Sequence, residues 1–227
     1  MKLGPGEPAA GPWRVERLEV FAQSLTDAAG DPVSRPRILA VDGRSGAGKS
    51  TLAERLRRAT ADAVVVHTDD VAWWHSRFGW SDLMVEGILK PLHAGHDVHY
   101  QPPAWAPRDR TGHIEVPASA STVIIEGVGA SRRELTSLID VAVWVQSDYE
   151  LAEQRGIQRD IQHEGRDPAE ALRNWWEWAD EEVPFLLADR PWERAGYIGA
   201  GTPWVAHDAD THVVTAPPLP AVRPAAT

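Results

Sequence analysis

The stretch GRSGAGKS at residues 43–50 is the strongest constraint on how this chain can fold. It has the pattern of a glycine, four residues and then Gly-Lys-Ser, which is the Walker A pattern. A strand must lead into such a loop and a helix must leave it, because backbone N–H groups bind an anion where the helix dipole is positive. The apolar run ILAV supplies the strand. The departing helix has an apolar face formed by Leu52, Ala53, Leu56 and Ala59.

Each fixed position of this motif has a chemical reason. The glycines let the backbone wrap around phosphates, Lys49 reaches the β and γ phosphates, and the Ser50 hydroxyl is a ligand for Mg²⁺. The motif therefore predicts a phosphate-binding loop (P-loop) for a nucleoside triphosphate, in preference to an ordinary glycine turn. The residues expected to bind the nucleotide from this loop are Gly43, Arg44, Ser45, Gly46, Ala47, Gly48, Lys49, Ser50 and Thr51.

Composition limits the other classes of function. With 227 residues, the chain is long enough for one sizeable domain. Its formal charge of −10 argues against a nucleic-acid partner, which would require clustered basic residues. It has no cysteine, no apolar run of about eighteen residues and no apolar signal segment. We therefore expect a soluble cytoplasmic protein with a small-molecule substrate and no membrane partner.

Short apolar runs alternate with helical segments through the middle of the chain. ILAV, AVVV, TVIIE and VAVWV are typical of buried strands in a parallel sheet with helices on both faces. This pattern predicts an α/β three-layer sandwich with a mainly parallel sheet. We expect a loose stretch up to residue 12 and a helix over 13–29 within an N-terminal extension of residues 1–35, followed by a P-loop domain over 36–210 and a flexible tail over 211–227.

Acidic residues end two of the predicted strands. Asp69 and Asp70 follow AVVVHT, and Glu126 ends TVIIE. Ligands of such sheets bind beyond the carboxyl ends of the strands, so these carboxylates are expected beside the loop. Transfer of a phosphoryl group to an alcohol requires one carboxylate to accept the hydroxyl proton and benefits from another at the metal. The alternative is that these residues cap helices or face water.

Three arginines lie in the segment EQRGIQRDIQHEGRD. Arg155 and Arg159 are four residues apart, which predicts that they share a helix face, and the segment ends in a Gly-Arg break that contains Arg166. An arginine-bearing lid over a triphosphate would neutralise transition-state charge and exclude water. A solvated helix face would have the same spacing.

Together, VDGRSGAGKSTLA, HTDD, VIIEG and RGIQRDIQHEGRD resemble the uridine kinase-like branch of the P-loop kinases, which includes phosphoribulokinase and one type of bacterial pantothenate kinase. The resemblance spans roughly residues 38–200. It implies transfer of the γ-phosphoryl group of ATP, with Mg²⁺, to a primary hydroxyl, classically the 5′-OH of uridine or cytidine. It also implies catalytic roles for Lys49, Asp69 and Arg159, metal ligation by Ser50, Asp69 and Glu126, and lid or phosphate contacts by Arg155, Arg159 and Arg166.

The acceptor is less well defined, because the chain departs from the family at two places. YQPPAW puts Pro103-Ala104 where relatives have a Tyr-Asp pair, and DDVAWW lacks the usual aromatic pair after the acidic residue. Pro and Ala offer no side-chain hydrogen bond to a ribose or a base. The acceptor is therefore a nucleoside, a modified nucleoside or another small alcohol. Candidate acceptor contacts are Asp69, Asp70, Trp73, Trp105 and Arg166, with Asp70 competing with Asp69 for the role of base.

Tryptophan and histidine clusters have two interpretations each. Trp73 and Trp105 could stack on a nucleobase or pack in the core, and the NWWEW segment, residues 174–178, is expected to pack against the sheet. The histidines of HAGHDVH are expected to face solvent, since they do not define one helical face with a fourth metal ligand.

Two further alternatives remain open from the sequence. The first is a kinase for pantothenate, a sugar phosphate or an antibiotic alcohol. The second is a regulator that binds ATP without transferring phosphate. The sequence leaves open both a homo-oligomer and the preference between ATP and GTP.

Overall fold

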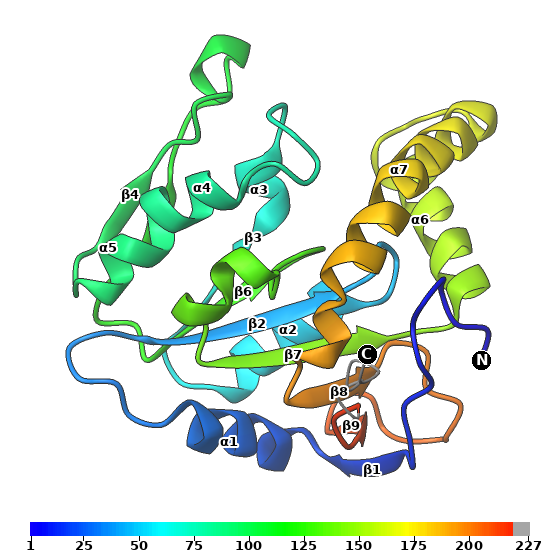
Figure 1. Ribbon diagram of the computed structural model, residues 1–227, viewed down its shortest axis with the longest axis horizontal. Helices are drawn as coiled ribbons and strands as arrows, with labels where there is room; N and C mark the ends of the chain where they lie inside the picture. The colour runs from blue at the N-terminus through cyan, green and yellow to red at the C-terminus, as the bar shows by residue number, and fades with distance from the viewer. Residues whose placement is uncertain (220–227) are drawn as a thin grey trace, which may run out of the picture.

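The computed structural model describes residues 1–219, which form a seven-stranded sheet with helices on both faces (Figure 1). The strand order is β1-β9-β8-β7-β2-β6-β3. Strands β8, β7, β2, β6 and β3 run parallel, β9 is antiparallel to β8, and β1 is antiparallel to β9. The strands are β1 (Arg14–Arg17), β2 (Arg37–Gly43), β3 (Ala63–His67), β6 (Thr122–Glu126), β7 (Val141–Gln146), β8 (Tyr197–Ala200) and β9 (His212–Ala216).

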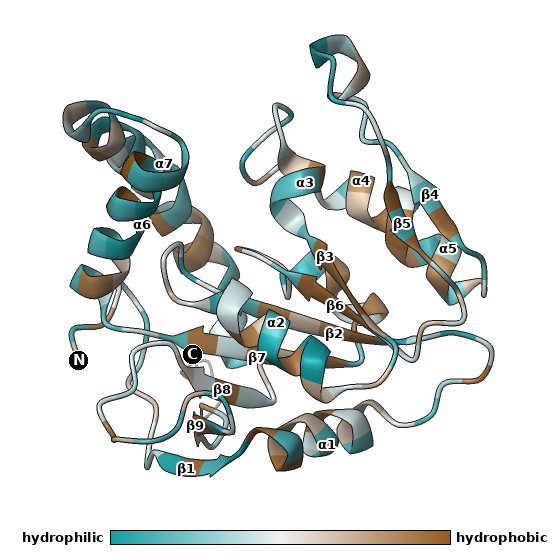
Figure 2. Ribbon diagram, turned by 180° about the vertical axis from the view of Figure 1, so that it is seen from behind, coloured by the Kyte–Doolittle hydropathy of each residue, from teal (hydrophilic) through white to brown (hydrophobic). Residues whose placement is uncertain are grey.

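Side chains alternate along the central strands and so build two cores. On β2, Ile38 and Ala40 pack on one face with the segment after β3, while Leu39 and Val41 pack on the other face. The second face is covered by α1 (Leu18–Ala29) and α2 (Lys49–Ala59). Figure 2 shows the hydrophobic colouring of β2, β3 and β6 between these layers. The prediction of an α/β three-layer sandwich with a mainly parallel sheet is confirmed.

The remaining helices form two groups (Figure 1): the first packs on the face of the sheet opposite α1 and α2, and the second lies toward the carboxyl ends of the parallel strands. One group follows β3 and carries a small antiparallel hairpin of β4 and β5. The other is a pair of long helices, α6 and α7, joined by a short break. The first group consists of α3 (Thr68–Ala72), α4 (Ser81–Met84), the π-helix η1 (Val85–Leu89), α5 (Lys90–His93), β4 (Val98–Tyr100), the 3₁₀-helix η2 (Ala106–Arg108) and β5 (Ile114–Val116). The others are the 3₁₀-helix η3 (Arg133–Leu138), α6 (Tyr149–His163), α7 (Pro168–Asp189) and the 3₁₀-helix η4 (Pro191–Glu193).

The start of the chain differs from the expectation of a loose stretch followed by one helix over 13–29. Residues 14–17 form β1, which pairs with β9, and the helix begins only at Leu18. The preceding residues are docked, because the carboxylate of Glu7 is buried and accepts hydrogen bonds from Trp144 and Gln146. These partners lie far along the chain, so no local sequence pattern could predict the contacts.

The expected flexible tail over 211–227 is wrong for its first part. Residues 212–216 form β9, which lies between β1 and β8 in the sheet. Val213, Val214 and Leu219 are buried, so this segment does pack against the core. Residues 220–227 lie outside the described part of the chain. Within residues 1–219, no helix is both long enough and apolar enough to cross a membrane.

The packing of α1 gives a stability prediction. Leu25 is fully buried against the sheet, so Leu25→Ala should lower the free energy of unfolding by about 2 to 5 kcal/mol through lost apolar burial and a cavity. Val20 lies on the exposed side of the same helix, and Val20→Ala should change the free energy of unfolding by less than about 0.5 kcal/mol. Urea unfolding of the two variants measures the difference. Equal effects would contradict the assigned packing of α1.

Candidate active site

The loop of residues 43–50 connects β2 to α2, as the motif predicts. Gly46 and Gly48 have φ values of +71° and +93°, which side chains with a Cβ atom rarely adopt. A Cβ atom on Gly46 would also overlap the carbonyl oxygen of Ala152 on α6. Backbone conformation thus favours glycine at both positions, and at Gly46 space requires it as well.

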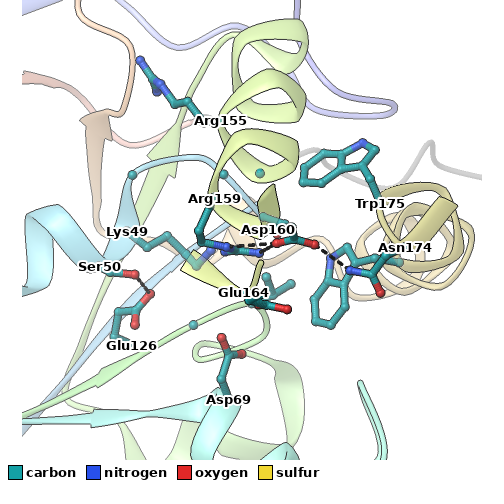
Figure 3. A pocket seen from close by; sticks show the side chains of 17 residues that line it. Lys49, Ser50, Asp69, Glu126, Arg155, Arg159, Asp160, Glu164, Asn174 and Trp175 are labelled. Atoms are coloured by element: carbon teal, nitrogen blue, oxygen red, sulfur yellow. Dashed lines mark hydrogen bonds and ion pairs between the residues drawn. The ribbon is translucent and has the colours of Figure 1, made fainter. Parts of the chain in front are cut away.

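A cavity of about 400 Å³ lies between this loop, the ends of β3 and β6, and the helices α6 and α7 (Figure 3). It contains most of the residues predicted to act together, although they are spread over more than a hundred positions. The predicted residues on its wall are Ser45, Gly46, Gly48, Lys49, Ser50, Asp69, Glu126, Arg155 and Arg159. Those that the structure puts elsewhere are Gly43, Arg44, Ala47, Thr51, Asp70, Trp73, Trp105 and Arg166.

Glu126 is held at the edge of this cavity by two neighbours. Its Oε1 atom accepts a hydrogen bond from the Ser50 hydroxyl at 3.1 Å, and its Oε2 atom lies 2.6 Å from Nδ1 of His67. Burial raises the pKa of Glu126, but the hydrogen bond with His67 and the charge of Lys49 outweigh burial and leave the pKa lowered. The same contact with Glu126 raises the pKa of His67. Glu126 is therefore a carboxylate at neutral pH.

Asp69 lies in the first turn of α3 and points into the cavity from the side opposite α6 (Figure 3). Its side chain is in contact with the water of the cavity, but protein walls remove much of its solvation and raise its pKa. The charges of Lys49 and Arg159 oppose this rise, and that of Glu126 adds to it. A carboxylate in these surroundings is suited to accept a proton.

Carboxylate and hydroxyl oxygens are the donors that Mg²⁺ prefers. Mg²⁺ is usually held by only one or two carboxylates, together with water and substrate phosphates. Ser50 and Glu126, with Asp69 on the same cavity, fit such a site. Within residues 1–219, no group of three or more His, Cys, Asp or Glu side chains is arranged to hold a metal by itself. The histidines of HAGHDVH therefore do not form a metal site of this kind.

The three predicted lid arginines have different hydrogen-bond partners. Arg159 donates to Asp160 at 3.0 Å, and Asp160 also accepts from Asn174 at 2.7 Å, which links α6 to α7 (Figure 3). Arg155 points away from this contact and donates to the carbonyl oxygen of Gly201 at 3.0 Å. Arg166 is not on the cavity wall itself but pairs with Glu164, which is. Helical spacing alone does not fix the position of the end of a long side chain. Here the nearby hydrogen-bond acceptors determine where each guanidinium group lies.

The acceptor candidates Asp70, Trp73 and Trp105 form a separate cluster around Arg110. Arg110 pairs with Asp70, and its guanidinium lies 3.7 Å from the ring centroid of Trp105 and 5.2 Å from that of Trp73. Trp105 is buried and donates from Nε1 to the carbonyl oxygen of Asp70. None of these side chains lines the cavity.

Two tryptophans of α7 line the cavity instead. Trp175 packs against Gly156 of α6, where any Cβ atom would overlap its ring, and Trp178 lies one turn further along. The expectation that residues 174–178 pack against the sheet is wrong for Trp175, which packs on α6, and for Trp176, which is exposed, whereas Trp178 packs against a core cluster that includes Trp144 of β7. The spacing of three residues between these tryptophans was the available signal that they share a helix face.

Three buried carboxylates that the sequence reasoning did not single out support the loop. Asp42, within the quoted VDG, accepts from the backbone N–H groups of Gly43 and Gly129 and from Ser131. Burial raises the pKa of Asp42, and these hydrogen bonds oppose the rise. Glu182 of α7 accepts from the backbone N–H of Ser45 at 2.7 Å. Glu7 contacts the side chain of Arg44.

The fold is that of the P-loop kinases. Residues 80–182 match the family described as Phosphoribulokinase / Uridine kinase family, and this range includes Glu126 and all three arginines of the lid segment. The resemblance found in the sequence is therefore confirmed. No curated protein sequence matches the chain significantly.

Two solved structures share the fold. One, from Silicibacter sp. TM1040, is provisionally described as a fructose transport system kinase, with 22% identity, a TM-score of 0.55, and coverage of 78% of this chain and 94% of that chain. The other, from Bacillus stearothermophilus, is provisionally described as a uridine kinase, with 18% identity, a TM-score of 0.50, and coverage of 80% and 96%. These levels of identity establish the shared fold and leave the substrate open.

The geometry of the loop predicts that one added methyl group at residue 46 weakens nucleotide binding. Gly46→Ala should weaken binding of Mg²⁺-ATP by at least about tenfold, because the left-handed conformation costs a non-glycine residue about 1 to 2 kcal/mol and the Cβ atom overlaps α6. Gly196→Ala is the control, since an added Cβ there meets no atom within 4 Å. Titration calorimetry measures both. Unchanged affinity in Gly46→Ala would refute this account of the loop.

Proposed function

We propose that the protein is an ATP-dependent kinase that transfers the γ-phosphoryl group to a hydroxyl of a small metabolite, with a nucleoside as the leading acceptor. The observation that carries this proposal is the position of Asp69, which faces the phosphate loop and Arg159 across one cavity. Phosphorylation of an alcohol benefits from a carboxylate at this point, which accepts the hydroxyl proton and orients the attack.

The phosphate loop would hold the donor. Lys49 and the loop N–H groups would bind the β and γ phosphates, and Ser50 and Glu126 would hold Mg²⁺, with Asp69 beside it. When bound, Mg²⁺ supplies charge stabilisation on the phosphate oxygens. A second cavity of about 330 Å³ shares Gly48 and Arg155 with the first and has room for the nucleoside part of ATP.

In the transfer step, the acceptor hydroxyl would give its proton to an Oδ atom of Asp69. The acceptor oxygen then bonds to the γ phosphorus as the bond to the oxygen bridging the β and γ phosphates breaks, and ADP leaves. Arg159 would face the transferring group, where a cation stabilises the developing charge. Closure of α6 and α7 would exclude water, whose attack would waste ATP.

The tryptophan side chains on α7 support a nucleoside as the acceptor. Trp175 and Trp178 present indole rings to the same cavity as Asp69, and an indole face stacks well on a planar base. A second candidate is a non-nucleoside alcohol such as a sugar. It is favoured by the engagement of Trp73 and Trp105 with Arg110, which removes the aromatic contacts that the sequence suggested for a base.

Substitution of the two adjacent aspartates tests the assignment of the base. Asp69→Asn should reduce acceptor phosphorylation by about 10² to 10⁴-fold while Mg²⁺-ATP still binds, because the proton acceptor is lost. Asp70→Asn should reduce it by less than about tenfold, since that carboxylate pairs with Arg110 away from the cavity. The two variants are compared by the rate of ADP release, measured at a saturating concentration of acceptor. The opposite ranking would transfer the role of base to Asp70.

A panel of acceptors tests the substrate class. Uridine, cytidine and modified nucleosides, pantothenate, sugars, sugar phosphates and aminoglycosides are each mixed with ATP and Mg²⁺, and acceptor-dependent ADP release is measured. We expect the nucleosides to give the highest kcat/KM. Turnover of a sugar alone would establish the second candidate, and ATP binding with no turnover of any acceptor would favour a regulator.

A further inference from the structure

We propose that Glu7 and Arg44 are a positioning pair, through which the N-terminal segment of residues 1–12 holds the phosphate loop in its binding conformation. We name residues 1–12 the N-terminal strap. The proposal rests on the proposed function in one respect, namely that the loop binds ATP. Neither the Walker A pattern nor the family match over residues 80–182 includes the strap.

The side chain of Arg44 leaves the loop on the side opposite the cavity. Its Nε atom donates to Oε2 of Glu7 at 3.2 Å, and its Nη2 atom donates to the carbonyl oxygen of Pro5 at 2.8 Å. The guanidinium also lies 5.8 Å from the ring centroids of both Tyr149 and Trp192. The side chains of Arg44 and Glu7 are only 4% and 1% exposed. The second loop residue is thus enclosed by protein rather than solvent.

The strap itself is fixed at several points. Oε1 of Glu7 accepts from Nε1 of Trp144 at 2.6 Å and from Nε2 of Gln146 at 3.0 Å, both on β7. Nearer the chain start, the carbonyl oxygen of Lys2 accepts from the backbone N–H of Tyr149 at 2.8 Å, at the beginning of α6. The strap therefore joins a central strand, the phosphate loop and the helix that carries Arg155 and Arg159.

The contact reaches the cavity through one more hydrogen bond. The carbonyl oxygen of Arg44 accepts from Nζ of Lys49 at 2.9 Å, so the backbone of Arg44 sets where the phosphate-binding amine lies before ATP arrives. On the next residue, the N–H of Ser45 is held by Glu182 from α7. Two buried carboxylates from distant segments thus hold adjacent loop residues. A loop held in its binding conformation loses less entropy when the ligand binds.

A buried ion pair of this kind is poor evidence for a role in stability alone. The cost of removing two charges from water often equals or exceeds their attraction, and apolar replacements of similar volume are often as stable. Placement of a pair on a ligand-binding loop is better explained by the need to hold one conformation. The distinction can be measured, because a positioning role changes ATP affinity and a purely structural role changes only the melting temperature.

The test compares Gly4→Ala and Glu7→Gln with the control Asp140→Asn. In Gly4→Ala, the new Cβ would overlap the guanidinium of Arg44 and displace it while every charged group is kept. Asp140 pairs with Arg35 at 2.8 Å at the opposite end of β2, and both side chains are 17% exposed. The control therefore loses a largely buried ion pair beyond the far end of β2, without a contact to the loop.

Titration calorimetry with Mg²⁺-ATP and thermal unfolding are measured on the full chain. We expect Gly4→Ala and Glu7→Gln to weaken ATP binding by about tenfold, comparable with the loss of one charge-assisted hydrogen bond. Asp140→Asn should lower the melting temperature while its affinity for ATP equals that of the wild type. If Glu7→Gln does not fold, Gly4→Ala supplies the same measurement with all charges present.

Wild-type affinity in Gly4→Ala or in folded Glu7→Gln, with only a lower melting temperature as in the control, would overturn the positioning role. A wild-type protein that does not bind Mg²⁺-ATP at all would overturn the proposed function, and this inference with it. The two failures are therefore distinguishable by whether the unmodified chain binds ATP.

Discussion

The phosphate loop can bind a polyanion only if several backbone N–H groups point to one place, and the rest of the structure is arranged around this constraint. Glycines permit the conformation but do not impose it, because glycine has many other conformations of similar energy. The conformation is imposed from outside by contacts from other segments. Asp42 ties the base of the loop to residues 129–131, Glu182 holds Ser45, and Glu7 holds Arg44. Each is a buried carboxylate that accepts hydrogen bonds from the groups around it.

The sequence predicts the parts of the fold that follow from local pattern. The strand, the loop and the apolar face of α2 are contiguous, so residues 38–59 could be assigned without knowledge of any partner. The positions of Asp69 and Glu126 beside the loop followed from one further rule, that the carboxyl ends of parallel strands lie at the same edge of a sheet. His67 and Glu126 are indeed register partners on β3 and β6, which brings the two strand ends together.

What could not be predicted depends on partners distant in the chain. Strands β1 and β9 form the edge of the sheet although about two hundred positions separate them, and neither has a strong strand pattern. Glu7 and Trp144 likewise are in contact although they lie 137 positions apart. The ends of the arginine side chains were also unpredictable, because the helical spacing of Arg155 and Arg159 fixes their Cβ positions and not the acceptors within reach. Trp175 and Trp178 line the cavity only because α7 folds back on α6.

Several polar groups of the cavity already have protein partners, and the kind of partner explains how the site can be both ordered and ready for a ligand. Lys49 and Arg155 donate to backbone carbonyl oxygens, and Ser50 donates to Glu126. These carbonyl oxygens are neutral, whereas a triphosphate would pair each cation with an opposite charge and so add Coulombic attraction to the hydrogen bond. The carbonyl partners therefore hold the cations in place in the absence of a ligand, yet a triphosphate can displace them with a gain in free energy. Arg159 differs, because its partner Asp160 is itself charged and also binds Asn174. This arginine is tied to the packing of α6 against α7, so its position depends on how the two helices sit together, whereas Lys49 is held by the carbonyl oxygen of Arg44 within the phosphate loop.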